Sequence, residues 1–300
     1  MKRFKVKQGP AEIFDISRDE YEKQTKLNRK YHEKGKDGEL RSFAICPACD
    51  NPIQILGLYK KLKNTEKPYG KHYCRSISIA PHDEQAYRFC PYSSNAYTIT
   101  ADSKVDEITD YNISIYNTMK NYFDLAIYVL KQDTGIYISR IEAKRLLDCY
   151  VSGEMYLYPW ATLYNIPWML MYFSPARKCY QMHIRKGSGL YQYFLTRDDI
   201  ILDQYQDSEY YVVKNKPGSF LRLEYSMILH KRKIVDDEVI ETISLEVFSY
   251  NKDNLPQTEY SETYTINEYR FPNLIQHAKY RDPSLLSIAE ELMPEMERKS

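Results

Sequence analysis

The chain has 300 residues, 43% of them hydrophobic and 14% aromatic, and a formal net charge of +1. This apolar content is enough to build a buried core, and it excludes a globally disordered chain. The longest strongly apolar stretch, residues 166–173, is much shorter than the roughly 20 residues that a membrane-spanning helix needs. Because no apolar leader segment follows the basic residues after Met1, we expect a globular cytoplasmic protein with no membrane partner.

The small net charge conceals an uneven distribution along the chain. Residues 1–75 hold 18 Lys and Arg against 10 Asp and Glu, whereas residues 76–300 hold 24 against 31. A cationic end is typical of proteins that contact the phosphate backbone of nucleic acids, although lysines also form ordinary solvated surfaces. The length allows two compact units, or one large unit with a small appended module.

Residues 1–40 predict a charged, helical lead. Ser17 is followed three residues later by Glu20, which is the pattern of a helix N-cap and predicts a helix that runs to about His32. Residues 41–100 combine short apolar runs with Pro and Gly turns and hold four of the six cysteines. This combination predicts a small module of short strands arranged around a metal ion.

Residues 101–180 predict a helical region, because apolar side chains recur there at spacings of three and four. Ser139 and Glu142 repeat the N-cap pattern and predict the start of one of these helices.

Residues 181–300 change to a period of two, which is typical of strands. The segments 220–229 and 241–250 predict a long antiparallel hairpin, and residues 283–293 predict a closing helix. Further strands are expected at 190–195, 210–213 and 259–266. We therefore predict an α+β protein with an N-terminal zinc-binding module, a helical middle and an antiparallel β-rich C-terminal part.

Four cysteines lie in the first third of the chain, and two of them, Cys46 and Cys49, form a Cys-x-x-Cys pair. Two thiolates at this spacing can bind one metal ion from a single tight turn, and thiolates are typical zinc ligands. In a reducing compartment, clustered cysteines are more often metal ligands than disulfides. The pattern predicts a Zn²⁺ site with Cys90 as the third ligand and Cys74 as the favoured fourth. It leaves His72 as the alternative, and His82 also lies in the same segment.

The Cys-x-x-Cys turn resembles a zinc knuckle or zinc ribbon at the level of the motif alone, because the chain has no second pair of this kind. Asp50 and Asn51 follow the turn and tolerate the left-handed backbone that such turns often need. The block from Lys67 to His72 resembles one that follows a Cys-x-x-Cys pair in competence-type zinc proteins of the CoiA kind, with matches at Lys67, Pro68 and His72. The resemblance implies support for His72 as a ligand and an association with DNA processing.

Several lysines lie between the expected metal ligands. Those considered as phosphate contacts are Lys60, Lys61, Lys63, Lys67 and Lys71. They predict a zinc-stabilised binding protein whose lysine-rich module contacts nucleic acid with a strong dependence on salt, while the remainder recognises a protein partner. The alternative is a solvated lysine-rich loop around a structural metal site.

An enzymatic alternative starts from Asp133, Glu142 and Lys144. An aspartate followed by Glu-x-Lys resembles the motif of PD-(D/E)xK nucleases, which implies two carboxylates that hold Mg²⁺ and a lysine that assists water attack on a phosphodiester. This hypothesis requires a strand at 136–144, whereas Ser139 as an N-cap favours a helix. A third interpretation is a non-enzymatic regulatory or structural subunit of a protein complex, from antiviral defence or a mobile element.

Aromatic residues are dense between positions 156 and 173, around Trp160 and Trp168. They predict either a platform on which bases or a ligand could stack, or a part of the core. Their helical spacing favours the core.

Overall fold

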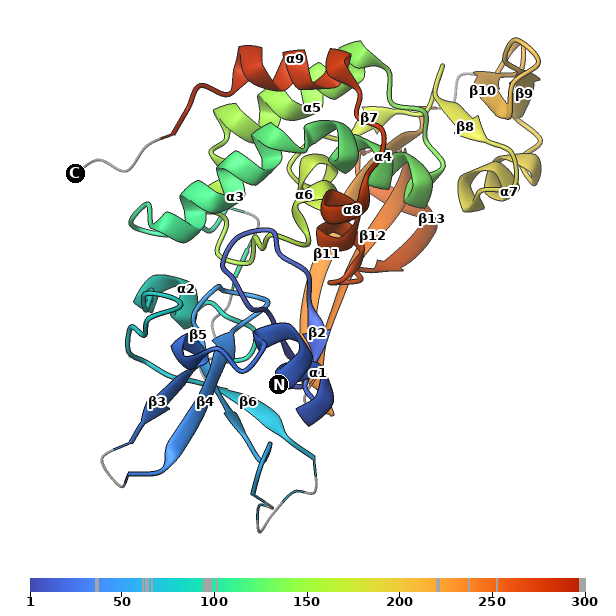
Figure 1. The fold of residues 1–300 in the computed structure, drawn as a ribbon. Coiled ribbons are helices and arrows are strands. Elements are labelled where there is room, and N and C mark those ends of the chain that lie inside the picture. Colours follow the sequence, from blue (N-terminus) through green and yellow to red (C-terminus); the bar gives the residue numbers. More distant parts are fainter. Residues whose placement is uncertain are drawn as a thin grey trace.

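The computed structural model describes residues 1–296 apart from 36–37, 61, 63–64, 66, 94–98, 101, 220–221, 237 and 252. Over these residues the protein is an α+β protein, as the sequence predicts, and its strands pair in antiparallel sheets (Figure 1). A small sheet formed by the first part of the chain lies at one end, most of the helices lie at the other, and a long hairpin extends between them.

The N-terminal sheet has the strand order β3-β4-β5-β6. Its strands are β3 (His32–Lys34), β4 (Leu40–Ile45), β5 (Pro52–Leu56) and β6 (Tyr69–His72). The preceding chain forms β1 (Arg3–Phe4), β2 (Phe14–Asp15), α1 (Arg18–Thr25) and the 3₁₀ turn η1 (Arg29–Tyr31), and α2 (Glu84–Arg88) follows the sheet. Ser17 caps α1 as predicted, but the helix is shorter than expected because Lys26 turns into the left-handed conformation, with a φ of 50°.

The helical middle confirms the predicted helical region. It comprises α3 (Asp110–Asn121), α4 (Phe123–Thr134), α5 (Arg140–Ser152), η2 (Met155–Leu157) and α6 (Ile166–Tyr172). Ser139 accepts a hydrogen bond from Glu142 N and so caps α5 as predicted. The closing helix α9 (Pro283–Leu292) packs against α3, α4 and α5, and it is preceded by α8 (Arg270–His277).

The long hairpin is formed by β11 (Glu224–Val235) and β12 (Glu238–Tyr250), which confirms the prediction for these residues. Strands β13 (Pro256–Thr265) and β7 (Arg177–Lys178) complete this sheet in the order β13-β12-β11-β7. Near the tip of the hairpin, Glu238 lies 3.7 Å from Lys2 Nζ and 3.7 Å from Arg3 Nη2. The hairpin therefore connects the C-terminal sheet to the start of the chain.

A small three-stranded sheet lies at the side of the molecule, with α7 (Gly189–Leu195) beside it (Figure 1). Its strands are β8 (His183–Arg185), β10 (Tyr210–Asn215) and β9 (Ile200–Gln204). The strand predicted at 190–195 is wrong, because these residues form α7. Leu190 and Phe194 are both buried and four residues apart, a helical spacing, and Ser188 caps the helix through Tyr191 N.

One continuous hydrophobic core joins the N-terminal sheet to the helical middle and the C-terminal sheet. It includes Phe4 and Ile53 at one end and Leu130, Trp168 and Leu245 at the other. Among the residues that the structure describes, no helix combines the length and the apolar character needed to cross a bilayer.

Candidate metal centre

Four side chains from three separated segments meet in one cluster: Cys46, Cys49, His72 and Cys90. Their ligand atoms all lie within 4.8 Å of one another. The Sγ atoms of Cys46 and Cys90 are 3.8 Å apart, and Cys49 Sγ is 3.3 Å from His72 Nε2. Tetrahedral zinc with bonds of about 2.0–2.3 Å places neighbouring ligand atoms about 3.3–3.8 Å apart, so a zinc ion fits the cluster.

The first two ligands come from the tight turn between β4 and β5. Cys46 N donates to Asn51 O at 2.8 Å, and Asp50 N donates to Cys46 O at 3.2 Å. Asp50 adopts the left-handed conformation with a φ of 57°, as the sequence predicts for this turn. Asn51 Nδ2 also lies 3.5 Å from Cys49 Sγ, so the side chain that follows the turn supports one of the ligands.

His72 supplies the imidazole because of the register of the N-terminal sheet. Strand β6 pairs with β5 so that His72 lies opposite Ile53, which shortly follows the Cys46 to Cys49 turn. Cys74 follows the end of β6, is exposed and lies outside the cluster. The structure therefore brings the alternative, His72, together with the other three side chains and leaves the favoured Cys74 outside the cluster.

Cys90 comes from the turn that ends α2, where its N–H donates to Tyr87 O at 3.1 Å. The start of this helix is joined to the other ligand turn, because Asp83 N donates to Asn51 Oδ1 at 2.8 Å. The ring of Tyr87 packs edge-on against His72 with centroids 5.0 Å apart. The segment that carries Cys90 is thus held against the turn that carries Cys46 and Cys49 and against the strand that carries His72.

The three sulfur ligands are almost completely removed from water. Burial raises the pKa of the Cys49 and Cys90 thiols. Burial also acts to raise the pKa of Cys46, but hydrogen bonds from Cys49 and Cys90 and the nearby His72 outweigh it, and this pKa is lowered. A bound cation favours the thiolate form of such groups, and four protein ligands close its coordination sphere. The arrangement suits a structural rather than a catalytic metal.

A buried ion pair between Lys5 and Asp50 lies beside the ligand turn, and no local pattern in the sequence predicts it. Asp50 Oδ2 also accepts a hydrogen bond from Gly9 N at 2.7 Å. Burial raises the pKa of Asp50, although Lys5 and Gly9 counteract this effect. The pair fastens the N-terminal segment to the turn that carries Cys46 and Cys49.

An acidic cleft of about 730 Å³ opens next to Cys49, between the ligand turns and the start of α3. Its acidic lining residues are Asp50, Asp83, Glu84, Asp106, Glu107 and Asp110. Arg88 and His82 also line it, and His82 Nε2 lies 3.0 Å from Glu84 Oε2. This excess of carboxylates repels phosphate groups, so the cleft side of the metal centre is unsuited to a nucleic-acid backbone.

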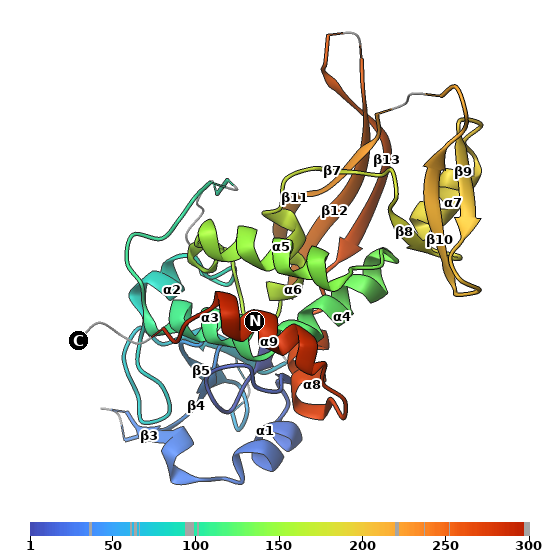
Figure 2. The same cartoon turned by 90° about the horizontal axis from the view of Figure 1, so that it is seen from above.

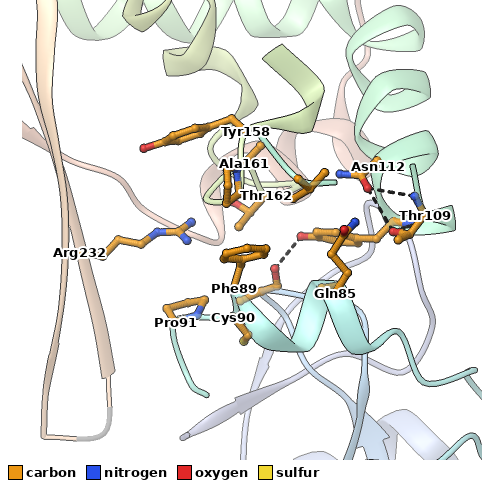
Figure 3. Close-up of a pocket in the computed structure, with 15 residues that line it drawn as sticks. Gln85, Phe89, Cys90, Pro91, Thr109, Asn112, Tyr158, Ala161, Thr162 and Arg232 are labelled. Atoms are coloured by element: carbon orange, nitrogen blue, oxygen red, sulfur yellow. Dashed lines mark hydrogen bonds between the residues drawn. The ribbon is translucent and has the colours of Figure 1, made fainter. Parts of the chain in front are cut away.

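A much smaller pocket of about 20 Å³ borders Cys90. In Figure 3, Phe89, Cys90 and Pro91 form one wall, Ala161 and Thr162 lie across from them, and Arg232 enters from β11. The volume holds no more than a water molecule or two. Arg232 Nη1 has no hydrogen-bond partner among the described residues and can donate to such a water. The pocket lies where the segment that carries Cys90 meets the helical middle.

The structure describes three of the five lysines that the sequence predicts to meet phosphates. Lys60, Lys67 and Lys71 are exposed on β6 and the β5–β6 connection, and Lys60 Nζ is 3.2 Å from Glu39 Oε1. Lys61 and Lys63 lie outside the described residues. The sheet of β3 to β6 lies at the opposite end of the molecule from α3, α5 and α9 in Figure 1.

The three residues of the nuclease hypothesis do not form a metal site. Glu142 and Lys144 lie on helix α5, where the hypothesis requires a strand, and they pair with Arg177 and Glu291. Asp133 is engaged by Trp168 Nε1 at 3.0 Å and by Arg270. Within the described part of the chain, the one group of metal-ligating side chains that the structure assembles is the Cys46 cluster.

A second buried polar centre surrounds Glu241 on β12. Its four donors are His230 Nε2 at 2.7 Å, Asn165 Nδ2 at 2.6 Å, Tyr164 Oη at 3.0 Å and Arg232 Nε at 2.9 Å. Burial acts to raise the pKa of Glu241, but Arg232, His230 and the other donors outweigh it and hold the pKa at about 2. Sequence reasoning missed this centre, although alternation along β12 places Glu241 on the same buried face as Ile243.

The aromatic cluster between 156 and 173 belongs largely to the core, as its spacing favours. Trp168 is 1% exposed, and Tyr156, Tyr158 and Tyr164 are also buried. They do not form a stacking surface.

No family model, no curated protein and no solved structure matches this chain. The functional assignment therefore depends on the geometry of the chain itself.

Proposed function

We propose that this protein is a zinc-stabilised nucleic-acid-binding protein, and that the zinc is structural. The observation that supports this proposal is the buried group of Cys46, Cys49, His72 and Cys90, whose spacing fits a tetrahedral zinc ion. These ligands join the β4–β5 turn, the end of β6 and the turn after α2. Zinc bound there stabilises a fold whose strands are too short to do so alone.

The lysine-bearing end of the N-terminal sheet is the proposed contact with nucleic acid. Lys67 precedes β6 and Lys71 lies within it, both are exposed, and the strand ends at the proposed zinc ligand His72. An ordered strand that carries Lys71 and begins just after Lys67 reduces the conformational entropy that is lost when these side chains meet phosphates. The acidic cleft beside Cys49 disfavours a phosphate backbone at that surface.

The first experiment measures zinc and duplex binding on the same purified protein. We expect about one zinc per chain, and a duplex affinity that falls steeply as salt is added. Lys67→Ala with Lys71→Ala should weaken binding and reduce the salt slope by about 0.9 for each phosphate that the variant no longer neutralises.

The matched control removes the same charge elsewhere. Lys104→Ala with Lys144→Ala removes two exposed lysines that pair with Glu154 and Glu291 in the helical part. This control should bind like the wild type. Zinc with no duplex binding, or equal effects of both double variants, would reject the nucleic-acid proposal and favour a non-enzymatic subunit of a protein complex.

A further inference from the structure

A second surface of the protein combines exposed aromatic rings with basic side chains. It is a groove of about 590 Å³ between α4, the connection from α8 to α9, and β10. Figure 2 shows α4 extending from beside α9 toward the β8–β10 sheet, on the opposite side of the helices from α2. The groove floor is apolar, with Leu125, Ile127 and Leu285 among its lining residues.

The rim of the groove carries tyrosine side chains that are exposed to solvent. Tyr128 on α4 is 50% exposed, and Tyr280 before α9 is 77% exposed. On the third side, Tyr210 of β10 packs edge-on against the exposed Tyr137, with centroids 5.3 Å apart. The aromatic contacts extend beyond the groove, because the ring centroids of Tyr137 and His183 are 6.0 Å apart.

The acidic groups at the groove already have partners within the fold. Asp124 accepts hydrogen bonds from Arg281 Nη2 at 2.7 Å and Arg281 Nε at 2.8 Å, and it also accepts from Asp282 N. Asp282 in turn caps α9 through Ser284 N at 3.0 Å. These carboxylates are therefore compensated before any ligand arrives.

The basic groups at the groove are better placed to meet a ligand. Lys131 Nζ lies 4.8 Å from the Tyr137 ring centroid and so stands next to an exposed aromatic face. Lys279 is exposed on the opposite rim. Arg185 Nη1 donates to Gln132 Oε1 at 3.1 Å and adds a further cation on the β10 side. The groove thus presents cations beside rings.

We propose that this groove binds single-stranded nucleic acid, with unpaired bases against Tyr128 and Tyr280 and phosphates at Lys131 and Lys279. Alternating rings and cations are the features by which proteins hold single strands, because every base has a face that can stack and every linkage carries a negative charge. A duplex keeps its base faces stacked inside and cannot use the rings. The inference rests on the proposed function for its ligand class, but it uses a different surface and needs no zinc ligand.

The test measures anisotropy of a labelled oligothymidylate of about 15 nucleotides, beside a duplex of the same length. Tyr128→Ala with Tyr280→Ala should weaken single-strand binding by roughly tenfold or more and leave duplex binding unchanged. Tyr128→Phe with Tyr280→Phe keeps the rings and should bind within about twofold of the wild type. Lys131→Ala with Lys279→Ala should lower the single-strand salt slope by about 0.7 for each phosphate that is no longer neutralised.

The Lys67→Ala, Lys71→Ala variant separates this inference from the proposed function. Single-strand binding that depends on the tyrosines and survives the loss of these two lysines supports the groove, whatever the duplex result. A different result overturns the groove proposal and leaves the proposed function standing. In that result, duplex binding depends on the two lysines, and single-strand binding is unchanged by Tyr128→Ala with Tyr280→Ala. Absence of any single-strand binding by the wild type also overturns the groove.

Discussion

The metal centre and the Glu241 centre both remove polar groups from water, but they obtain their balancing charges from different sources. At Glu241 the chain itself supplies the cation, Arg232, and the neutral donors that satisfy the carboxylate. At the metal centre the three thiols and the imidazole are all electron-pair donors to a cation. We therefore expect the stability of the first centre to depend on the fold and on pH, and that of the proposed metal centre to depend on the supply of metal.

The largest expected effect comes from removing a zinc ligand. Cys46→Ser should abolish the one zinc per chain and destabilise the N-terminal part by more than about 5 kcal/mol, because structural zinc contributes of the order of 10 kcal/mol of binding free energy. Metal analysis by mass spectrometry and thermal unfolding measure both results. Cys74→Ser is the matched control, since this thiol is exposed and outside the cluster. Zinc retained in Cys46→Ser but lost in Cys74→Ser would reverse the ligand assignment.

The stability that the Glu241 centre provides should not depend on bound metal but should depend on the charge of the Glu241 carboxylate. Glu241→Gln leaves Arg232, which is 5% exposed, without its counter-ion, and should cost about 3–5 kcal/mol in urea unfolding with no change in zinc content. Glu154→Gln disrupts the exposed pair with Lys104 and should cost less than about 1 kcal/mol. Loss of zinc from Glu241→Gln would show that the two centres are not independent.

A smaller loss of stability is expected when the pH is lowered. The pKa of Glu241 is about 2 in the folded protein, below the ordinary value of 4.5. The contribution of the ionised carboxylate to the free energy of unfolding is therefore fully present above pH 4.5 and is lost as the pH falls toward 2. The shift corresponds to about 3 kcal/mol. Unfolding measured in steps across this range should show the loss in the wild type but not in Glu241→Gln. Parallel pH profiles of the two proteins would contradict this origin.

The two centres also differ in how far the sequence predicts them. The Cys46 and Cys49 turn is predictable because both ligands and the left-handed Asp50 lie within five residues of one another. The choice of His72 over Cys74 depends on the pairing of β6 with β5, which local pattern does not determine.

The Glu241 centre is harder to predict, because its partners are distant in sequence. Alternation along β12 places Glu241 on the buried face, but Tyr164 and Asn165 lie more than 70 residues earlier in the chain. In contrast, the Ser17 and Ser139 caps and the β11–β12 hairpin are local features, and the sequence predicts each of them. The strand prediction for residues 190–195 is wrong because, over so short a segment, burial at a spacing of four also fits alternation.

The smallest expected effect comes from removing the two predicted helix caps, which report on the stability of the N-terminal part and of the helical middle. Ser17 caps α1, next to the N-terminal sheet, and Ser139 caps α5 in the helical middle. Replacing either serine by alanine should cost about 1 kcal/mol in the zinc-loaded protein. After chelation the N-terminal part no longer holds α1, so Ser17→Ala should cease to matter while Ser139→Ala keeps its effect in urea unfolding. Equal penalties before and after chelation at both positions would mean that zinc does not stabilise the N-terminal part selectively.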